Sequence, residues 1–396
     1  MAAPSVVDVR APALGKAARS CVAPGQERRK QRYWGRYVVR TLARRLERQK
    51  AGSSSFARII GCGVFPVAGR SVGIAVRSGL DGPCGYEVGV QHCGSVWTCP
   101  VCSAKIRARR AVDLGALCER YTADGGWLVM VTFTMRHSRE DSLEGERHAM
   151  TRAWSSLRQS PAFRDLGPEV DGFVCATEVT DGENGWHLHK HVLFFVPGSS
   201  AGDAGATGCG VRKQAEVLST DLPTTRLGSV MAMIGALAPL WCRLIERHTG
   251  KVPVRERAFD MQLMNSGAGV YLSKVGDELT RSDVKGRSPF GLLHGVAAGE
   301  PRAIARWIEY ADTMKGAHAL EYSKGLRELL GALPELSDDE IVAQDEGGVI
   351  VEWLPASEWY RLCESFDSEG VSLAFRRLEY WEARARSGPL PAVRRG

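Results

Sequence analysis

The sequence lacks three features that would each have pointed to a familiar class of protein. No Gly-x-x-x-x-Gly-Lys-[Ser/Thr] loop occurs, which argues against an ATP-driven helicase. The first twenty residues have no long apolar core, so we expect no secretory signal. The most apolar window, Leu227 to Trp241, has about fifteen residues where a membrane span needs roughly twenty, and it predicts a buried helix. We therefore expect a cytoplasmic protein with no membrane partner.

A disulfide scaffold is also excluded. The chain has eleven cysteines, an odd number, and no export signal accompanies them. Cys99 and Cys102 form a Cys-Pro-Val-Cys motif, but no thioredoxin-like βαβ pattern surrounds it, which argues against a redox centre. The cysteines are therefore expected to be reduced or bound to metal.

The overall composition is that of a soluble globular protein, with 44% hydrophobic and 24% charged residues. The net charge of +7 suggests an anionic partner. Ten basic residues and one acid lie between Arg28 and Lys50, together with Tyr33, Trp34 and Tyr37. Such a segment can contact phosphates and stack on bases, or it can be a solvated helix face. By contrast, residues 335–352 hold seven acids and no basic residue.

Four segments follow from these patterns. We expect a basic flexible segment over 1–55, a cysteine-rich region over 56–110, a packed domain over 111–331 and an acidic region over 332–396. Period-two and helical spacing predict the following elements of the packed domain: a strand over 127–135, a helix over 142–157, a hairpin over 171–196 that turns at 181–185, a helix over 227–248 interrupted or started near Pro239, and a strand over 258–264.

The stretch "CGSVWTCPVCSAKI" predicts a tetrahedral zinc site from Cys93, Cys99 and Cys102. Cys62, in "IIGCGV", is the expected fourth ligand because glycines on both sides allow a tight turn; Cys84 and His92 compete for that place. The helix that follows carries four cations suited to gripping a phosphate backbone: Lys105, Arg107, Arg109 and Arg110.

In "GWHLHKHVLFF" three histidines occupy every second position, so a strand would direct His187, His189 and His191 to one face. Glu178 lies on the strand expected to pair with them. Two imidazoles and a carboxylate hold a divalent cation and leave positions open for water or phosphate oxygens, which is typical of Lewis-acid chemistry.

Downstream, "VYLSKV" places Tyr271 and Lys274 one helical turn apart. A phenol is a weak nucleophile at its ordinary pKa near 10, but a polarised phosphodiester and a nearby ammonium make attack feasible. The tyrosine–lysine pair indicates this chemistry only together with the histidines and cysteines.

These motifs together resemble the rolling-circle replication initiators, the Rep proteins of small bacterial plasmids, in the HUH endonuclease superfamily. The resemblance is closest to the actinobacterial branch. It runs from residue 59 to 331 through "CGSVWTCPVCSAKI", "VTFTMRH", "EVTDGENGWHLHKHVLFF", "YLSKVGDELTRSDVKGRSPFGLL" and "YSKGLRELLG". It implies an α+β fold: an HUH-endonuclease domain whose central antiparallel sheet is flanked by helices, with a small zinc-binding insertion.

The resemblance also implies the reaction. Tyr271 would attack a phosphodiester of single-stranded origin DNA, giving a 5′-phosphotyrosyl enzyme and a free 3′-hydroxyl that primes synthesis. A later cut and rejoining would release the circle. Mg²⁺ or Mn²⁺ at the histidines would orient the scissile phosphate, and zinc would be structural. The partners would be origin DNA, a host helicase and a DNA polymerase.

Two departures from the family pattern matter. The usual motif is His-hydrophobe-His, yet Lys190 separates His189 from His191. We prefer that pair because it directly precedes the apolar run, as in relatives, and keep His187 as the second choice. Lys190 would face the opposite side of the strand, towards solvent or DNA phosphate.

The second departure concerns the terminating cut. Some relatives carry a water-activating glutamate four residues before the tyrosine, where this chain has Gly267. The candidates for this role are Asp277, Glu278 and a second tyrosine, Tyr310 or Tyr322; both tyrosines are expected to be structural, and the sequence does not decide among the candidates. His137, at the end of "VTFTMRH", is expected to belong mainly to a core strand.

Other functions remain open. A non-enzymatic zinc-bearing DNA-binding regulator would explain the cysteines and the basic segment, but not the histidine strand. Relaxases and single-strand transposases share the chemistry, yet relaxases generally place the tyrosine before the histidines, and the transposases are shorter and lack the cysteines.

Overall fold

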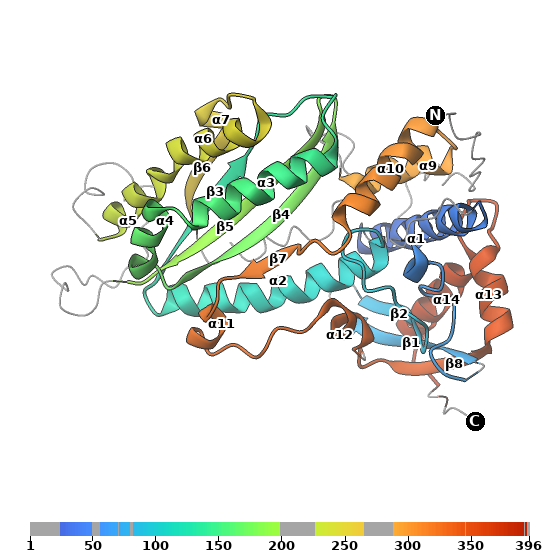
Figure 1. The fold of residues 1–396 in the computed structure, drawn as a ribbon. Helices are drawn as coiled ribbons and strands as arrows, with labels where there is room; N and C mark the ends of the chain where they lie inside the picture. The colour runs from blue at the N-terminus through green and yellow to red at the C-terminus, as the bar shows by residue number, and fades with distance from the viewer. Residues whose placement is uncertain are drawn as a thin grey trace. The chain divides into compact units, whose positions relative to one another are not determined.

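The structure is a computed structural model that describes residues 24–49, 56–69, 71–79, 82–198, 226–264, 288–344, 346–391 and 393. The described residues form two compact units. The first unit draws on 1–107, 276–315 and 336–396, and the second on 108–275 and 316–335. The fold is mixed α+β with antiparallel sheets, as expected (Figure 1). The division into four functional segments stays a prediction.

The second unit is built on a five-stranded antiparallel sheet in the order β6-β3-β5-β4-β7. The predicted hairpin is confirmed, and its histidine-bearing strand is the centre of the sheet. Its elements are β3 (Trp127–Thr134), β4 (Gly172–Gly182), β5 (Gly185–Val196), β6 (Phe259–Met264), β7 (Leu320–Tyr322), α3 (Leu143–Arg158), α4 (Pro161–Leu166), α5 (Arg226–Gly235), α6 (Leu237–Thr249), α7 (Arg255–Ala258), α11 (Leu326–Leu329) and the 3-10 turn η2 (Gly167–Glu169).

Helices cover both faces of this sheet (Figure 1). The helix α2 (Pro100–Ala123) packs Leu114 and Cys118 against Leu193 and other apolar side chains of one face. On the other face, Phe133 lies 5.6 Å from Trp154 of α3 and 4.9 Å from Trp241 of α6, measured between ring centroids. Strand alternation thus divides the apolar side chains between two cores.

One described helical stretch, Arg226–Thr249, is long and apolar enough to cross a membrane, a composition that core helices share. It is interrupted between α5 and α6, close to Pro239 as expected. Pro239 itself lies in the first turn of α6, where proline is tolerated. Trp241 is buried and donates a hydrogen bond from Nε1 to the carbonyl of Thr134 at 2.8 Å. The predicted buried helix is therefore packed on the sheet.

The first unit contains a three-stranded antiparallel sheet in the order β2-β1-β8. Trp359 is fully buried in the core of this unit and Trp381 packs against the same apolar cluster, whereas Tyr360 is 42% exposed. The unit contains η1 (Ala57–Ile59), β1 (Ser71–Gly79), β2 (Gly82–Val88), η4 (Pro289–Leu292), α9 (Leu293–Ala297), α10 (Pro301–Met314), α12 (Asp338–Ala343), β8 (Val349–Pro355), α13 (Ala356–Glu364) and α14 (Leu373–Ser387).

The basic segment differs from the expected flexible lead-in. Residues 24–48 form the helix α1 (Pro24–Arg48), which contributes Trp34, Val38 and Leu42 to the core. The sequence offered two roles for its charges, contact with phosphates or a solvated helix face, and neither role holds for the arginines that face inward. Arg36 pairs with Glu87 at 2.6 Å and Arg40 with Glu364 at 2.8 Å.

The aromatic residues of α1 are also used internally. Tyr33 donates a hydrogen bond to Glu87 and Trp34 stacks on His294 with ring centroids 4.8 Å apart. Tyr37 meets Phe366 edge-on at 4.5 Å. These rings are engaged in packing rather than presented to nucleic-acid bases.

The turn that aligns the histidine strand requires glycine at Gly185. Its φ is +95°, and a Cβ there would lie 2.7 Å from the carbonyl oxygen of Ser138. We predict that Gly185→Ala lowers the free energy of unfolding by about 2 kcal/mol, from backbone strain and this contact. Gly115→Ala is the control: it lies in α2 with open space around it and should stabilise by about 0.5–1 kcal/mol. Urea unfolding of both variants checks this, and equal effects would contradict it.

Candidate metal centres

The register of the β4–β5 hairpin brings the predicted acid and histidines together. Glu178 lies directly opposite His189 on the neighbouring strand, and His191 lies one alternating position along the same face. Both histidines are nearly buried, at 7% and 5% exposure, while the Glu178 side chain is 28% exposed. The three side chains form one of two groups that could hold a metal ion among the described residues.

Two of the three distances between the ligand atoms match neighbouring corners of an octahedral site. His189 Nε2 and His191 Nε2 lie 3.0 and 3.1 Å from the same Glu178 oxygen, Oε2. Ligands about 2.1 Å from a metal are about 3.0 Å apart at neighbouring octahedral corners. Tetrahedral ligands at a similar bond length would be about 3.4 Å apart. The donor set and these two distances therefore suit a divalent cation.

His187 is not part of this group, although it shares the face. Its ring lies 4.8 Å from His189 and stacks on His137 at 4.9 Å, measured between centroids. Burial, together with the nearby His189 and His137, lowers the pKa of His187 to about 4, so its imidazole is neutral near pH 7. His137 thus lies beside the histidine row rather than only in a core strand.

Lys190 differs from the expectation that it reaches solvent or DNA. It does face the opposite side of β5, but it is only 8% exposed. Its ammonium donates to Thr177 Oγ1 at 3.0 Å and lies 3.8 Å from Cys175 Sγ. That face is packed by helices, so strand alternation gave the side chain's direction correctly but not what covers it.

The predicted nucleophile lies outside the described residues. The same holds for Lys274 and for Gly267, Asp277 and Glu278. Of the substitute tyrosines, Tyr310 is buried against Trp307. Burial raises the pKa of Tyr322 to about 12, which disfavours its tyrosinate form. Both tyrosines are therefore packed within the fold.

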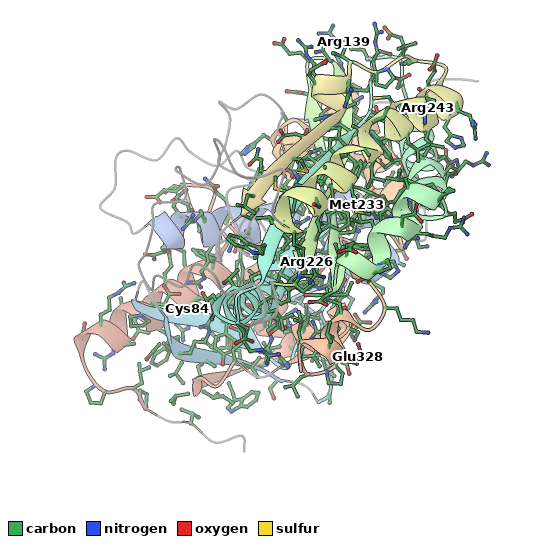
Figure 2. All side chains as sticks on the ribbon, turned by 90° about the vertical axis from the view of Figure 1, so that its left-hand side faces the viewer. Cys84, Arg139, Arg226, Met233, Arg243 and Glu328 are labelled. Carbon is green, nitrogen blue, oxygen red and sulfur yellow. The ribbon has the colours of Figure 1, made fainter. Side chains whose placement is uncertain are left out.

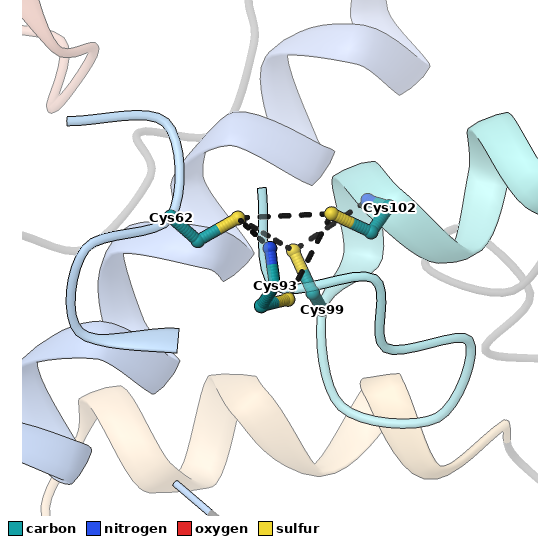
Figure 3. Close-up of side chains that lie close together, drawn as sticks. All are labelled: Cys62, Cys93, Cys99 and Cys102. Atoms are coloured by element: carbon teal, nitrogen blue, oxygen red, sulfur yellow. Dashed lines mark hydrogen bonds between the residues drawn. The ribbon is translucent and has the colours of Figure 1, made fainter. Parts of the chain in front are cut away.

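The four predicted cysteines form the second group, and their sulfurs point to one centre (Figure 3). Cys62 Sγ lies 3.8 Å from Cys99 Sγ and 3.6 Å from Cys102 Sγ, and Cys93 Sγ lies 3.7 Å from Cys102 Sγ. Four sulfurs about 2.3 Å from a tetrahedral zinc ion are about 3.8 Å apart. The cluster therefore fits a closed structural zinc site, with Cys62 as the fourth thiolate.

Two tight turns present these thiols. Gly63 and Gly94, each directly after a cysteine of the cluster, have φ of +72° and +62°. The backbone amides of Cys93 and Cys102 point at Cys62 Sγ and Cys99 Sγ, at 3.4 and 3.5 Å. Such N–H···S contacts stabilise thiolates.

The competitors for the fourth position do not join the group. Cys84 lies on β2, and burial raises the pKa of its thiol. His92 stays outside the group, although it helps the other cysteines, Cys102 first, to lower the pKa of Cys62.

A buried cation lies next to the cysteine cluster. A Cβ at Gly63 would be 2.1 Å from Arg36 Nη1, so only glycine fits beside this guanidinium. Burial alone would lower the pKa of Arg36, but Glu87 and the nearby thiols Cys62 and Cys99 hold it well above its ordinary value. Four thiolates around zinc carry net negative charge, and this α1 arginine offsets part of it.

The four cations after the cysteines are mostly paired with protein groups. Lys105 Nζ contacts Glu346 at 2.9 Å and the Val342 carbonyl at 3.0 Å. Arg110 pairs with Glu335 at 3.5 Å, and Arg107 lies over the Trp97 ring at 5.7 Å.

Arg109 is the most exposed of the four in its ion pair, at 45%, and it pairs only with its helix neighbour Asp113. Pairs of this kind are worth little, so its charge stays available to a ligand. Exposed cations that the sequence analysis did not single out include Arg139, after β3, and Arg243, on α6 (Figure 2).

Comparisons with known proteins found a match to one family model and to two curated relatives. Residues 89–202 match the profile of Rep_1, described as "Replication protein", and this range contains Glu178 and the histidine strand. A Streptomyces lividans protein named "Protein rep" is 27% identical over 304 residues, 62% of this chain and 64% of the relative. A Streptomyces cyanogenus "Neomycin resistance protein" is 32% identical over 145 residues, 30% of this chain and 33% of the relative. The chain thus spans less than two thirds of either relative. No solved structure matches it.

The zinc site predicts a clear difference between two cysteine substitutions. Cys62→Ser removes one of four thiolates and should abolish the bound zinc and lower the thermal stability of the protein. Cys84→Ser, outside the cluster, should keep about one equivalent of zinc per chain, the content expected of the wild type. Elemental analysis of the purified proteins measures this. Full zinc content in Cys62→Ser would contradict the assignment.

Proposed function

Residues 89–202 match the Rep_1 family of replication proteins, and on this premise we propose that the chain initiates plasmid replication by nicking and rejoining origin DNA. The reaction is a transesterification through a 5′-phosphotyrosyl intermediate, in an HUH-type domain. The observation that carries the proposal is the group of Glu178, His189 and His191 on the central strands of an antiparallel sheet.

These three residues would hold the catalytic cation. Bound there, a divalent metal ion supplies Lewis-acid polarisation of the scissile phosphate. Glu178 Oε2 lies 3.0 and 3.1 Å from the two imidazole nitrogens, so these three donors would hold the ion and leave room for phosphate oxygens or water. Because both histidines are nearly buried, bulk water reaches the group mainly from the side of Glu178.

Tyr271 is the proposed nucleophile. Its hydroxyl oxygen forms a bond to phosphorus as the bond from phosphorus to the 3′-oxygen breaks. The phenol gives up its proton and the leaving 3′-oxygen takes one up, so no external energy source is needed. Lys274, three residues further along the sequence, would stabilise the phenolate and the phosphate charge by its ammonium group.

The cysteine cluster and the cations of α2 are proposed to hold the fold and to bind DNA. The cysteine cluster stabilises the start of α2, and Arg109 is an exposed cation in the first half of that helix. Lys105, Arg107 and Arg110 are proposed to act by holding the fold rather than by direct phosphate contact. Lys190 is not proposed to contact DNA, because it is buried.

The test is adduct formation on single-stranded oligonucleotides tiled across the origin of the replicon. A 3′-end label should become covalently attached to the protein in Mn²⁺ or Mg²⁺ and not in EDTA. A 5′-end label should leave with a free 3′-hydroxyl that a polymerase extends. Tyr271→Phe should lower the adduct by at least 1,000-fold, on the order expected for loss of a nucleophile.

Tyr380→Phe is the matched control, because Tyr380 is 51% exposed and lies far along the chain. It should form the adduct as the wild type does. An adduct that persists in Tyr271→Phe would refute this nucleophile. Tight DNA binding with no adduct in any metal would refute the enzyme and leave a DNA-binding regulator.

A further inference from the structure

The ring of His191 is held at both of its nitrogens. Nε2 faces Glu178 Oε2 at 3.1 Å, and Nδ1 lies 3.0 Å from Thr132 Oγ1 of β3. A ring fixed at both ends has a single orientation, with Nε2 directed at the point where the three ligand atoms converge.

The sheet places Thr132 where it can do this. Thr132 is the direct partner of His191 in the β3–β5 ladder, so both side chains rise from the same face. On the other side of His191 the partner is Ala176, whose small side chain leaves the ring free to lean towards Glu178. A β-branched threonine has few χ1 rotamers, which keeps its hydroxyl in place.

We propose that Thr132 is a positioning residue for the metal centre, which deepens the proposed function and rests on it. When Nε2 of a neutral imidazole binds a cation, the ring proton is on Nδ1, and Thr132 Oγ1 accepts it in a hydrogen bond. This fixes the tautomer that has its lone pair on Nε2. The hydroxyl therefore selects and aims the form of His191 that binds metal.

The neighbouring row shows that the arrangement is specific to His191. Thr134 is the direct partner of His189, yet its hydroxyl donates to the carbonyl of Arg257 instead. His189 Nδ1 has no hydrogen-bond partner among the described residues. Two threonines on one face of β3 thus have different roles, which provides an internal control.

The experiment is titration of the full-length, zinc-loaded protein with Mn²⁺, followed by the electron paramagnetic resonance signal of free Mn²⁺. Thiolate sites prefer zinc, so Mn²⁺ reports on the histidine centre alone. Thr132→Val removes the hydroxyl and keeps the shape, and should weaken Mn²⁺ binding about tenfold, the lower end for loss of such a partner. Thr132→Ser keeps the hydroxyl and should stay within about twofold of wild type. Thr134→Val should also stay within about twofold.

The outcomes separate this inference from the proposed function. Thr132→Val binding as tightly as wild type, or Thr132→Ser and Thr134→Val weakening as much as Thr132→Val, would overturn the positioning role. Glu178→Ala tests the centre itself: undiminished Mn²⁺ binding in that variant would overturn the metal site and the proposed function with it. Circular dichroism melting of each variant verifies that it is folded.

Discussion

The pairing register of β4 and β5 is the constraint on which the histidine centre depends. Gly182 pairs with Gly185 across a two-residue turn, and from this point the ladder sets Glu178 opposite His189. A slip of one residue would turn the histidines to the face that Lys190 now occupies, because strand side chains alternate. The left-handed backbone at Gly185 and its close contact with the chain near Ser138 help to keep that register.

The two candidate metal centres are built by different means and suit different ions. The histidine centre uses the regular spacing of a sheet and has ligand atoms 3.0–3.1 Å apart, with nitrogen and oxygen donors. The cysteine centre uses irregular turns with left-handed glycines and has sulfurs 3.6–3.8 Å apart. The four thiolates favour zinc, whereas the histidine centre offers the nitrogen and oxygen donors that divalent cations such as Mn²⁺ accept.

Local periodicity was sufficient to predict what depends on neighbouring residues. Alternation placed the histidines on one face, the turn signal gave the hairpin, and the glycines around Cys62 identified the fourth cysteine. Ion pairs between residues far apart in the sequence could not be predicted. The acid that pairs with Arg36 lies 51 residues away and the one that pairs with Arg40 lies 324 away, so α1 looked like a free basic segment. Thr132 was also missed, since only the β3–β5 register distinguishes it from other strand threonines.

The most direct test is anomalous diffraction from crystals of the full-length protein with zinc and Mn²⁺, recorded at the absorption edge of each metal. The account predicts one manganese peak bounded by Glu178 Oε2, His189 Nε2 and His191 Nε2, and one zinc peak among Cys62, Cys93, Cys99 and Cys102. A manganese peak between His187 and His189, or no manganese peak at all, would contradict the histidine centre described above.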